Sequence, residues 1–162
     1  MNTGILRFSL VASLLSLGGA LAVQYWGGLA PCHLCTIQRI PYVAVIVLSL
    51  VGIAIPAARK CKLSWLIMIL FLSGAGVAAY HAGVEKHLIA GPSSCTSSSG
   101  AGQSVDDLLQ KIKSAPIVAC DQPQWEFHGI TLSLLNMIWS LALAFYVAAA
   151  ARKKVDNAQA SR

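Results

Sequence analysis

Charged residues are scarce in this chain. They make up 11% of its 162 residues, and only 6 residues are acidic, whereas hydrophobic residues account for 56%. A soluble domain carries roughly a quarter charged residues, so this composition excludes an ordinary soluble protein. The sequence also lacks internal repeats, a glycine-rich dinucleotide motif and a phosphate-binding loop, so we find no indication of a repeat architecture or a nucleotide site.

The hydrophobic residues are gathered in long apolar runs. Four runs approach the roughly 20 residues that a helix needs to cross a bilayer. They cover residues 5–25, 40–57, 63–80 and 130–151. Each is predicted to be helical, because a helix satisfies its own backbone hydrogen bonds where no water can reach them. We expect an all-α fold, a transmembrane four-helix bundle that forms a single membrane domain over residues 1–162.

The first run has a second interpretation. Arg7, the apolar stretch and the small residues Ala20–Ala22 could compose a cleavable signal peptide. The stretch is long for the core of such a peptide, however, and it ends in Tyr25 and Trp26, which are typical anchors at a membrane surface. We therefore favour four retained spans.

The net charge of +6 is unevenly distributed. Basic residues gather before the first run, between the second and third, and after the fourth: Arg7, Arg59, Lys60, Lys62, Arg152, Lys153, Lys154 and Arg162. This is the positive-inside pattern of a membrane protein, so we expect no nucleic-acid partner. It predicts cytoplasmic termini and places residues 26–39 and 84–129, with four of the five cysteines, on the outer side.

The long outer segment combines a flexible part with an amphipathic one. Residues 91–103 are rich in glycine and serine, which predicts a mobile loop around Cys95. Ser104 is a candidate N-cap, and apolar residues follow at helical spacing: Val105, Leu108, Leu109 and Ile112. We expect a short helix here, lying on the membrane surface or packing on the ends of the spans.

Cys32 and Cys35 form a Cys-x-x-Cys motif at the expected start of the second span. Two thiols one helical turn apart can close a disulfide, and a helix N-terminus favours a thiolate. Cys35 lies deeper in the expected helix and is favoured as the thiolate. Arg39, four residues later, would stabilise this anion from the same face. Pro41 indicates that the helix begins near Gln38 or is kinked there.

Other roles for the cysteines remain open. Cys32 and Cys35 could form a permanent disulfide or half of a zinc site. A zinc site made of two cysteine pairs needs both pairs to be closely spaced in the sequence, and Cys95 and Cys120 are far apart. We therefore expect no metal. Cys95 and Cys120 lie where stabilising disulfides are common, but loosely held disulfides are often redox-active. Cys61, between two lysines on the expected cytoplasmic side, is interpreted as a free thiol.

Two segments resemble the disulfide bond formation protein B family (DsbB), the thiol:quinone oxidoreductases of the bacterial inner membrane. The first runs from Gln24 to Arg39 and contains the PCHLC motif with an arginine four residues after its second cysteine. The second, Cys120–Gly129, resembles the family's passage from a cysteine to a tryptophan before the last span. The resemblance spans nearly the full chain.

The resemblance implies an enzyme that reoxidises a periplasmic thioredoxin-like dithiol oxidase and passes the electrons to a membrane quinone, either ubiquinone or menaquinone. This activity would support disulfide formation in exported proteins. By the same resemblance, a Cys95–Cys120 disulfide accepts electrons through a mixed disulfide at Cys95. Cys120 then exchanges with Cys32, and Cys35 donates to the quinone beside Arg39.

The remaining cofactor residues are less well aligned. The family has a histidine near the quinone before its third cysteine, and both His81 and His87 are available. We favour His87, because His81 falls at the end of the third span, where a structural histidine is more common. Gln24 is a further candidate quinone contact. Glu85 closes the run Tyr80–Glu85, which also resembles a family pattern, and it fits a solvated glutamate at the membrane surface at least as well. Trp125 fits an interfacial belt as well as a quinone contact.

Two rival functions remain. One is a non-enzymatic membrane protein that binds copper or zinc through its outer cysteines and histidines. The other is a structural membrane subunit whose disulfides brace the outer loops.

Overall fold

The computed structural model describes residues 3–55, 63–92 and 118–160, and for residues 154–160 it describes the helix without its side chains. Cys61, Cys95 and the helix expected after Ser104 lie outside the described residues. The elements, in chain order, are α1 (Thr3–Tyr25), α2 (His33–Ile37), α3 (Ile40–Ala54), α4 (Leu63–Glu85), β1 (Glu126–Phe127), β2 (Ile130–Thr131) and α6 (Leu132–Ala160).

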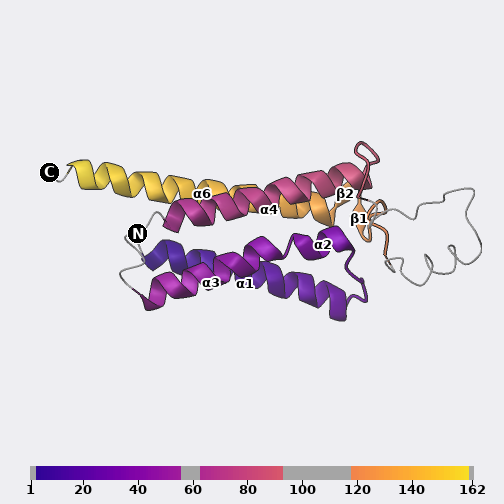
Figure 1. Ribbon diagram of the computed structural model, residues 1–162, viewed down its shortest axis with the longest axis horizontal. Helices are drawn as coiled ribbons and strands as arrows, with labels where there is room; N and C mark the ends of the chain where they lie inside the picture. Colours follow the sequence, from indigo (N-terminus) through magenta and orange to yellow (C-terminus); the bar gives the residue numbers. More distant parts are fainter. Residues whose placement is uncertain (1–2, 56–62, 93–117, 161–162) are drawn as a thin grey trace, which may run out of the picture.

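The helices run lengthwise as two pairs. Helix α4 packs along α6, α1 packs along α3, and contacts between α3 and α4 join the pairs (Figure 1). Helix α2 and the β1–β2 hairpin lie at one end of the bundle, and the start of α1 and the end of α6 lie at the other (Figure 1). The Cys-x-x-Cys motif, which follows the first span, therefore lies at the same end of the bundle as the hairpin that precedes α6.

Among the residues that the structure describes, four segments are long and apolar enough to cross a membrane, which confirms the predicted all-α fold with four spans. They are Thr3–Tyr25, His33–Ala54, Leu63–Glu85 and Leu132–Lys153. Leu6, Val45 and Ile67 are fully buried between the helices, whereas Leu15 is 69% exposed and Phe145 76%. Such large apolar side chains on the outside of a bundle are stable against lipid and costly against water. The chain is a multi-pass membrane protein.

The second span begins earlier than predicted and is broken. Helix α2 precedes α3, and Pro41 lies in the first turn of α3, where the absence of an N–H costs nothing. The break at Gln38 and Arg39 confirms the interruption that Pro41 predicted. The N–H of Gln38 donates to the carbonyl of Leu34, and the N–H of Arg39 donates to that of Thr36.

Helix α4 extends to Glu85, five residues past the predicted end of the third span at Tyr80. The predicted end was that of the apolar run, and polar residues follow it. The structure satisfies them within the protein: His81 contacts Gln38, Glu85 accepts a hydrogen bond from Ser133, and the Tyr80 hydroxyl donates to the carbonyl of Ala90.

A short hairpin of two strands, each two residues long, precedes α6 and was not predicted. Glu126 pairs with Thr131 and Phe127 with Ile130. The two turn residues, His128 and Gly129, both have positive φ, at 50° and 80°. Positive φ at both central positions is the geometry of a type I′ turn. This turn favours glycine at its second central position, where Gly129 lies. The hairpin fixes the chain just before α6, next to Trp125.

Candidate active site

The thiols of the Cys-x-x-Cys motif face each other at the start of α2. Both cysteines are free, and their Sγ atoms are 2.7 Å apart. Cys32 is the N-cap of the helix, and its sulfur accepts a hydrogen bond of 3.2 Å from the backbone N–H of Cys35. Only 3% of Cys32 is exposed. The two sulfurs need only a small approach to form a disulfide.

The negative charge of this dithiol lies on Cys32. Hydrogen bonds from the Cys35 thiol and from His81 outweigh burial and lower the pKa of the Cys32 thiol to about 4. The sequence favours Cys35 as the thiolate, because it lies deeper in the expected helix. The structure differs because the helix begins at His33, so that Cys32, as its N-cap, receives the donors of the first turn.

His81 completes the immediate surroundings of the dithiol. Its Nε2 lies 3.5 Å from the Cys32 sulfur, and the residue is 3% exposed. The structure therefore brings His81 to the site, contrary to our preference for His87. His87 is exposed just beyond α4, with φ of 56°, and it does not line the cavity described below. Because α4 continues through Glu85, its inner face carries His81 to α2.

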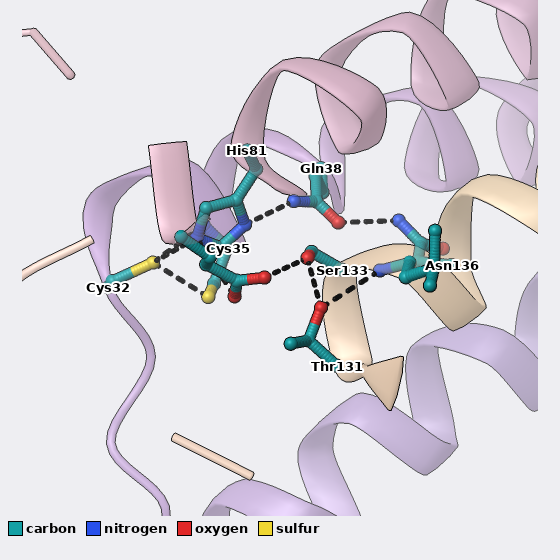
Figure 2. A network of polar contacts seen from close by, with 9 residues as sticks. Cys32, Cys35, Gln38, His81, Thr131, Ser133 and Asn136 are labelled. Carbon is teal, nitrogen blue, oxygen red and sulfur yellow. Dashed lines mark hydrogen bonds and ion pairs between the residues drawn. The ribbon is translucent and has the colours of Figure 1, made fainter. Parts of the chain in front are cut away.

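A chain of hydrogen bonds leads from His81 into the bundle (Figure 2). The amide nitrogen of Gln38 lies 2.6 Å from Nδ1 of His81, and the amide nitrogen of Asn136 donates to Oε1 of Gln38 at 2.6 Å. The hydroxyl of Tyr42 donates to Oδ1 of Asn136 at 2.7 Å and lies 2.8 Å from Oγ of Ser140. With these amide orientations Gln38 donates to Nδ1, so the proton of neutral His81 is on Nε2 and faces Cys32.

Glu85 belongs to the same polar cluster. Its side chain is 6% exposed, and Oε1 lies 3.6 Å from Nε2 of His81. The Ser133 hydroxyl donates to the other carboxylate oxygen, and it lies 2.8 Å from Oγ1 of Thr131 (Figure 2). Thr131 in turn accepts from the N–H of Leu134 in the first turn of α6. Of the two interpretations of Glu85, the solvated glutamate is wrong, because the Ser133 hydroxyl at the start of α6 stabilises the carboxylate inside the protein.

Arg39 and Gln24, both predicted cofactor residues, form a pair. Nη1 of Arg39 donates to Oε1 of Gln24 at 2.8 Å. Arg39 lies at the break between α2 and α3, so it does not continue one helical face with Cys35 as expected. It nevertheless lines the same cavity as Cys35, whereas Gln24 is in contact with the guanidinium and does not itself line that cavity.

A cavity of about 430 Å³ adjoins the dithiol. Its polar lining includes both cysteines, Arg39, His81 and Glu85, and its walls include the apolar side chains Leu15, Val23, Leu135, Trp125 and Trp139. A mainly apolar pocket of this size with a few convergent polar groups is typical of a site for a small organic cofactor. A metal ion is the other ligand for which donors are present: the ligand atoms of Cys32, Cys35 and His81 all lie within 4.8 Å of one another.

Cys120 reaches this end of the bundle from the segment before the hairpin. It is 1% exposed, it is disulfide-bonded, and it belongs to the same buried cluster as Cys32, Leu34 and Val84. The structure thus places a disulfide next to a free dithiol. Such a juxtaposition allows thiol–disulfide exchange.

Comparison with known proteins agrees with this arrangement. The model of the family described as disulfide bond formation protein DsbB matches residues 3–150 of the chain. The chain belongs to the DsbB family.

Several relatives of this DsbB-family protein cover most of its length. A disulfide bond formation protein B of Xanthomonas oryzae pv. oryzae (strain MAFF 311018) is 28% identical over 158 residues, which is 92% of this chain and 88% of the relative. Its counterpart in Ralstonia nicotianae is 28% identical over 78% of this chain and 79% of the relative. A protein of Rickettsia prowazekii named uncharacterized protein RP370 is 29% identical over 83% and 79%. No solved structure matches the chain.

Family membership gives the site its general meaning. A DsbB-family protein is a membrane oxidoreductase of disulfide bond formation, and this chain carries a free dithiol and a disulfide-bonded cysteine at one end of its spans. Sequence reasoning missed Asn136, Ser133 and the role of Glu85 at this DsbB site. A signal for Glu85 was present, because it lies four residues after His81 and continues the buried face of α4.

Proposed function

We propose that this protein reoxidises a periplasmic thioredoxin-like dithiol oxidase and passes the electrons to a membrane quinone, either ubiquinone or menaquinone. The observation that carries the proposal is the position of the dithiol. Cys32 and Cys35 line an apolar cavity in the spans, and Cys32 shares a buried cluster with disulfide-bonded Cys120. Electrons can therefore enter by exchange with Cys120 once its disulfide has been reduced, and they can leave toward an apolar acceptor in the cavity.

The cavity residues fit a quinone. Its ring is flat and apolar and carries two carbonyl oxygens, which suit apolar walls with one strong donor. Trp139 and Leu135 would hold the ring, and the Arg39 guanidinium, oriented by Gln24, would donate to a carbonyl oxygen. When bound, the quinone supplies a two-electron acceptor. Arg39 also places a permanent positive charge at the cavity that Cys35 lines, which stabilises negative charge on sulfur.

The chain's own cysteines carry out the exchange. A thiolate on Cys120 attacks the Cys32 sulfur of an oxidised Cys32–Cys35 pair, so the Cys32–Cys120 bond forms and Cys35 leaves as a thiolate. A thiolate on Cys95 then attacks Cys120, which closes the Cys95–Cys120 disulfide and releases Cys32. Two electrons have then moved onto the Cys32–Cys35 pair. Two free thiols with Cys120 in a disulfide are what this state requires.

The partner of Cys120 is proposed to be Cys95. Cys32 and Cys35 are free, which leaves Cys61 and Cys95 among the five cysteines. Cys61 lies between two lysines in a segment whose basic residues predict the cytoplasmic side. Cys95 belongs to the same outer segment as Cys120, and the family resemblance assigns it the contact with the soluble partner.

Charge supports the orientation. Arg152 and Lys153 follow the apolar part of α6, and Arg7 lies near the start of α1, both at the end of the bundle away from the dithiol. Basic residues mark the cytoplasmic side. The proposed location is the bacterial inner membrane, with both termini cytoplasmic and the redox cysteines periplasmic.

Quinone reduction by purified protein tests the proposal. The protein in detergent is mixed with a reduced thioredoxin-like dithiol protein and a soluble ubiquinone analogue, and quinone absorbance is followed. We expect turnover in the wild type and in the control Cys61→Ser, slow turnover in Arg39→Ala and none in Cys35→Ser. Equal turnover in Cys35→Ser and the wild type would overturn the proposal.

One observation favours the second candidate, a non-enzymatic membrane protein that binds copper or zinc. Cys32, Cys35 and His81 present three ligand atoms of the types that these metals prefer. Metal analysis of purified protein, combined with the quinone assay, decides between the two. Stoichiometric metal together with no quinone reduction after the metal is removed would establish this candidate.

A further inference from the structure

We infer that the reduced dithiol, together with His81, is a Zn²⁺ site that holds the protein in its reduced form and stops electron delivery. Zinc binding itself follows from the geometry alone. The inhibition that it causes rests on the proposed function, because it blocks the same two sulfurs.

The distance between the sulfur of Cys32 and the nitrogen of His81 matches tetrahedral zinc, whereas the two sulfurs are about 1 Å too close. Zn–S bonds of about 2.3 Å and Zn–N bonds of about 2.0–2.1 Å place a sulfur and a nitrogen ligand about 3.5 Å apart. Nε2 of His81 lies 3.5 Å from the sulfur of Cys32. Two zinc-bound sulfurs are about 3.8 Å apart, whereas those of Cys32 and Cys35 are 2.7 Å apart. The Cys35 sulfur must shift by about 1 Å, and the cavity that it lines leaves room for this.

Glu85 lies beside this group of ligands rather than in it, because the ligand atoms that lie within 4.8 Å of one another are those of Cys32, Cys35 and His81. The Oε1 atom of Glu85 is 3.6 Å from Nε2 of His81, and its side chain is 6% exposed. A water molecule would take the fourth position, as it does in zinc sites with three protein ligands. Two thiolates neutralise the charge of Zn²⁺, and the extra negative charge of Glu85 is balanced by Arg39, which lines the same cavity. Thiolate and imidazole are both established zinc ligands, and a set with two thiolates selects zinc over magnesium or calcium.

The surroundings of His81 are those of a metal-bound histidine, whose second nitrogen is held by a polar partner. Zinc on Nε2 requires the imidazole proton on Nδ1, which lies 2.6 Å from the Gln38 amide. If the amides of Gln38 and Asn136 turn over, Nδ1 donates to a carbonyl oxygen. This series of hydrogen bonds ends at the hydroxyls of Tyr42 and Ser140, which can donate in either direction. The direction of all the hydrogen bonds can therefore reverse without the loss of any of them.

Binding depends on the redox state. Zinc takes the two sulfurs as thiolates and displaces their protons, and no electron is transferred, because zinc has no redox chemistry under these conditions. The oxidised pair has no thiolate and should not bind. Zinc-bound Cys32 and Cys35 are held apart by the ion, so they cannot form the disulfide that releases their electrons.

Calorimetric titration of ZnCl₂ into the full chain in detergent tests binding. The protein is reduced with a phosphine in one sample and oxidised to the disulfide in another. We expect one zinc per chain in the reduced wild type and none at this site in the oxidised protein. Affinity should fall on the order of 100-fold in His81→Ala and to a smaller extent in Glu85→Gln. The matched controls His87→Ala and Cys61→Ser should bind as the wild type does.

Zinc binding that is the same in His81→Ala, or the same in the oxidised protein, would overturn the site. A quinone assay on metal-free protein separates this inference from the proposed function. Quinone reduction without stoichiometric zinc binding would refute the inference alone, and zinc binding without quinone reduction would refute the proposed function alone. Quinone reduction that continues at saturating zinc would refute the inhibition.

Discussion

Gln38 and His81 are 43 residues apart in the sequence, and their side chains meet at 2.6 Å inside the protein. The contact joins the end of α2 to α4 and orients the imidazole so that its other nitrogen faces the Cys32 sulfur. The side chain of Gln38 forms its hydrogen bonds with His81 and Asn136 and not with either sulfur. It acts on the dithiol through His81 and is a positioning residue.

Gln38→Leu should therefore slow quinone reduction without preventing folding. Loss of a hydrogen bond to a buried group costs about 1–3 kcal/mol, which corresponds to a loss of roughly 5- to 150-fold in kcat. The measurement is kcat with the soluble quinone, together with the thermal midpoint. Ser73→Ala, which removes an exposed hydroxyl bound to the Leu70 carbonyl on α4, is the control and should change neither value. A wild-type kcat in Gln38→Leu would exclude the positioning role.

The sequence was sufficient for the spans and for the residues with strong local motifs. Apolar length predicted all four spans, Pro41 predicted the break before α3, and Arg39 and Gln24, both chosen for the cofactor, are in contact. These features depend on short stretches of chain or on composition. None of them requires knowing which face of a helix meets which neighbour.

The contacts of His81, Glu85 and Asn136 could not be predicted, because they depend on which face of each helix meets its neighbour. In a membrane helix the lipid-facing residues are as apolar as the buried ones, so helical periodicity does not reveal the inner face. A weaker signal lay in the small residues Gly74, Ala75 and Ala78, which mark close helix packing and whose face leads to His81.

Alkylation of Cys32 should be nearly independent of pH over the neutral range. The thiolate is the reactive form, and the pKa of Cys32 is lowered to about 4, so the thiolate persists as the pH falls and is lost only near that value. An ordinary thiol, with a pKa of about 8.5, loses reactivity about tenfold per pH unit below that value. The measurement is the rate at which iodoacetamide labels the Cys32 peptide, followed from about pH 5 to about pH 9.

His81→Ala provides the contrast for this pH profile. It removes a hydrogen bond that lowers the pKa of Cys32, so labelling should begin to fall at higher pH than in the wild type. All samples contain a chelator, so that bound metal does not protect the thiol. Identical profiles in the two proteins would show that His81 does not stabilise the thiolate.

Gly52 should be less tolerant of a side chain than Gly76. A Cβ on Gly52 would lie 2.7 Å from Cδ2 of Leu63 and 3.0 Å from Cδ1 of Leu6, and both leucines are buried in the core. Gly52→Ala should lower the free energy of unfolding by about 1–2 kcal/mol through overpacking. Gly76→Ala meets nothing within 4 Å and should leave stability unchanged or slightly raised. Unfolding in a detergent and denaturant titration compares the two, and equal stabilities would contradict the packing at Gly52.

Gln24→Leu should weaken the productive binding of quinone more than it slows the electron-transfer step. Gln24 does not line the cavity, and its recorded contact there is the 2.8 Å hydrogen bond from Arg39. Without it the guanidinium keeps its charge and loses its fixed direction, so the KM for the soluble quinone should rise several-fold while kcat changes by less than about twofold. Arg39→Lys should show the same pattern more strongly, because an ammonium group lacks the planar, forked donors. Arg39→Ala removes the charge as well and should also lower kcat. If Gln24→Leu lowered kcat and left KM unchanged, the Arg39–Gln24 pair would have a role other than orienting the donor for the quinone.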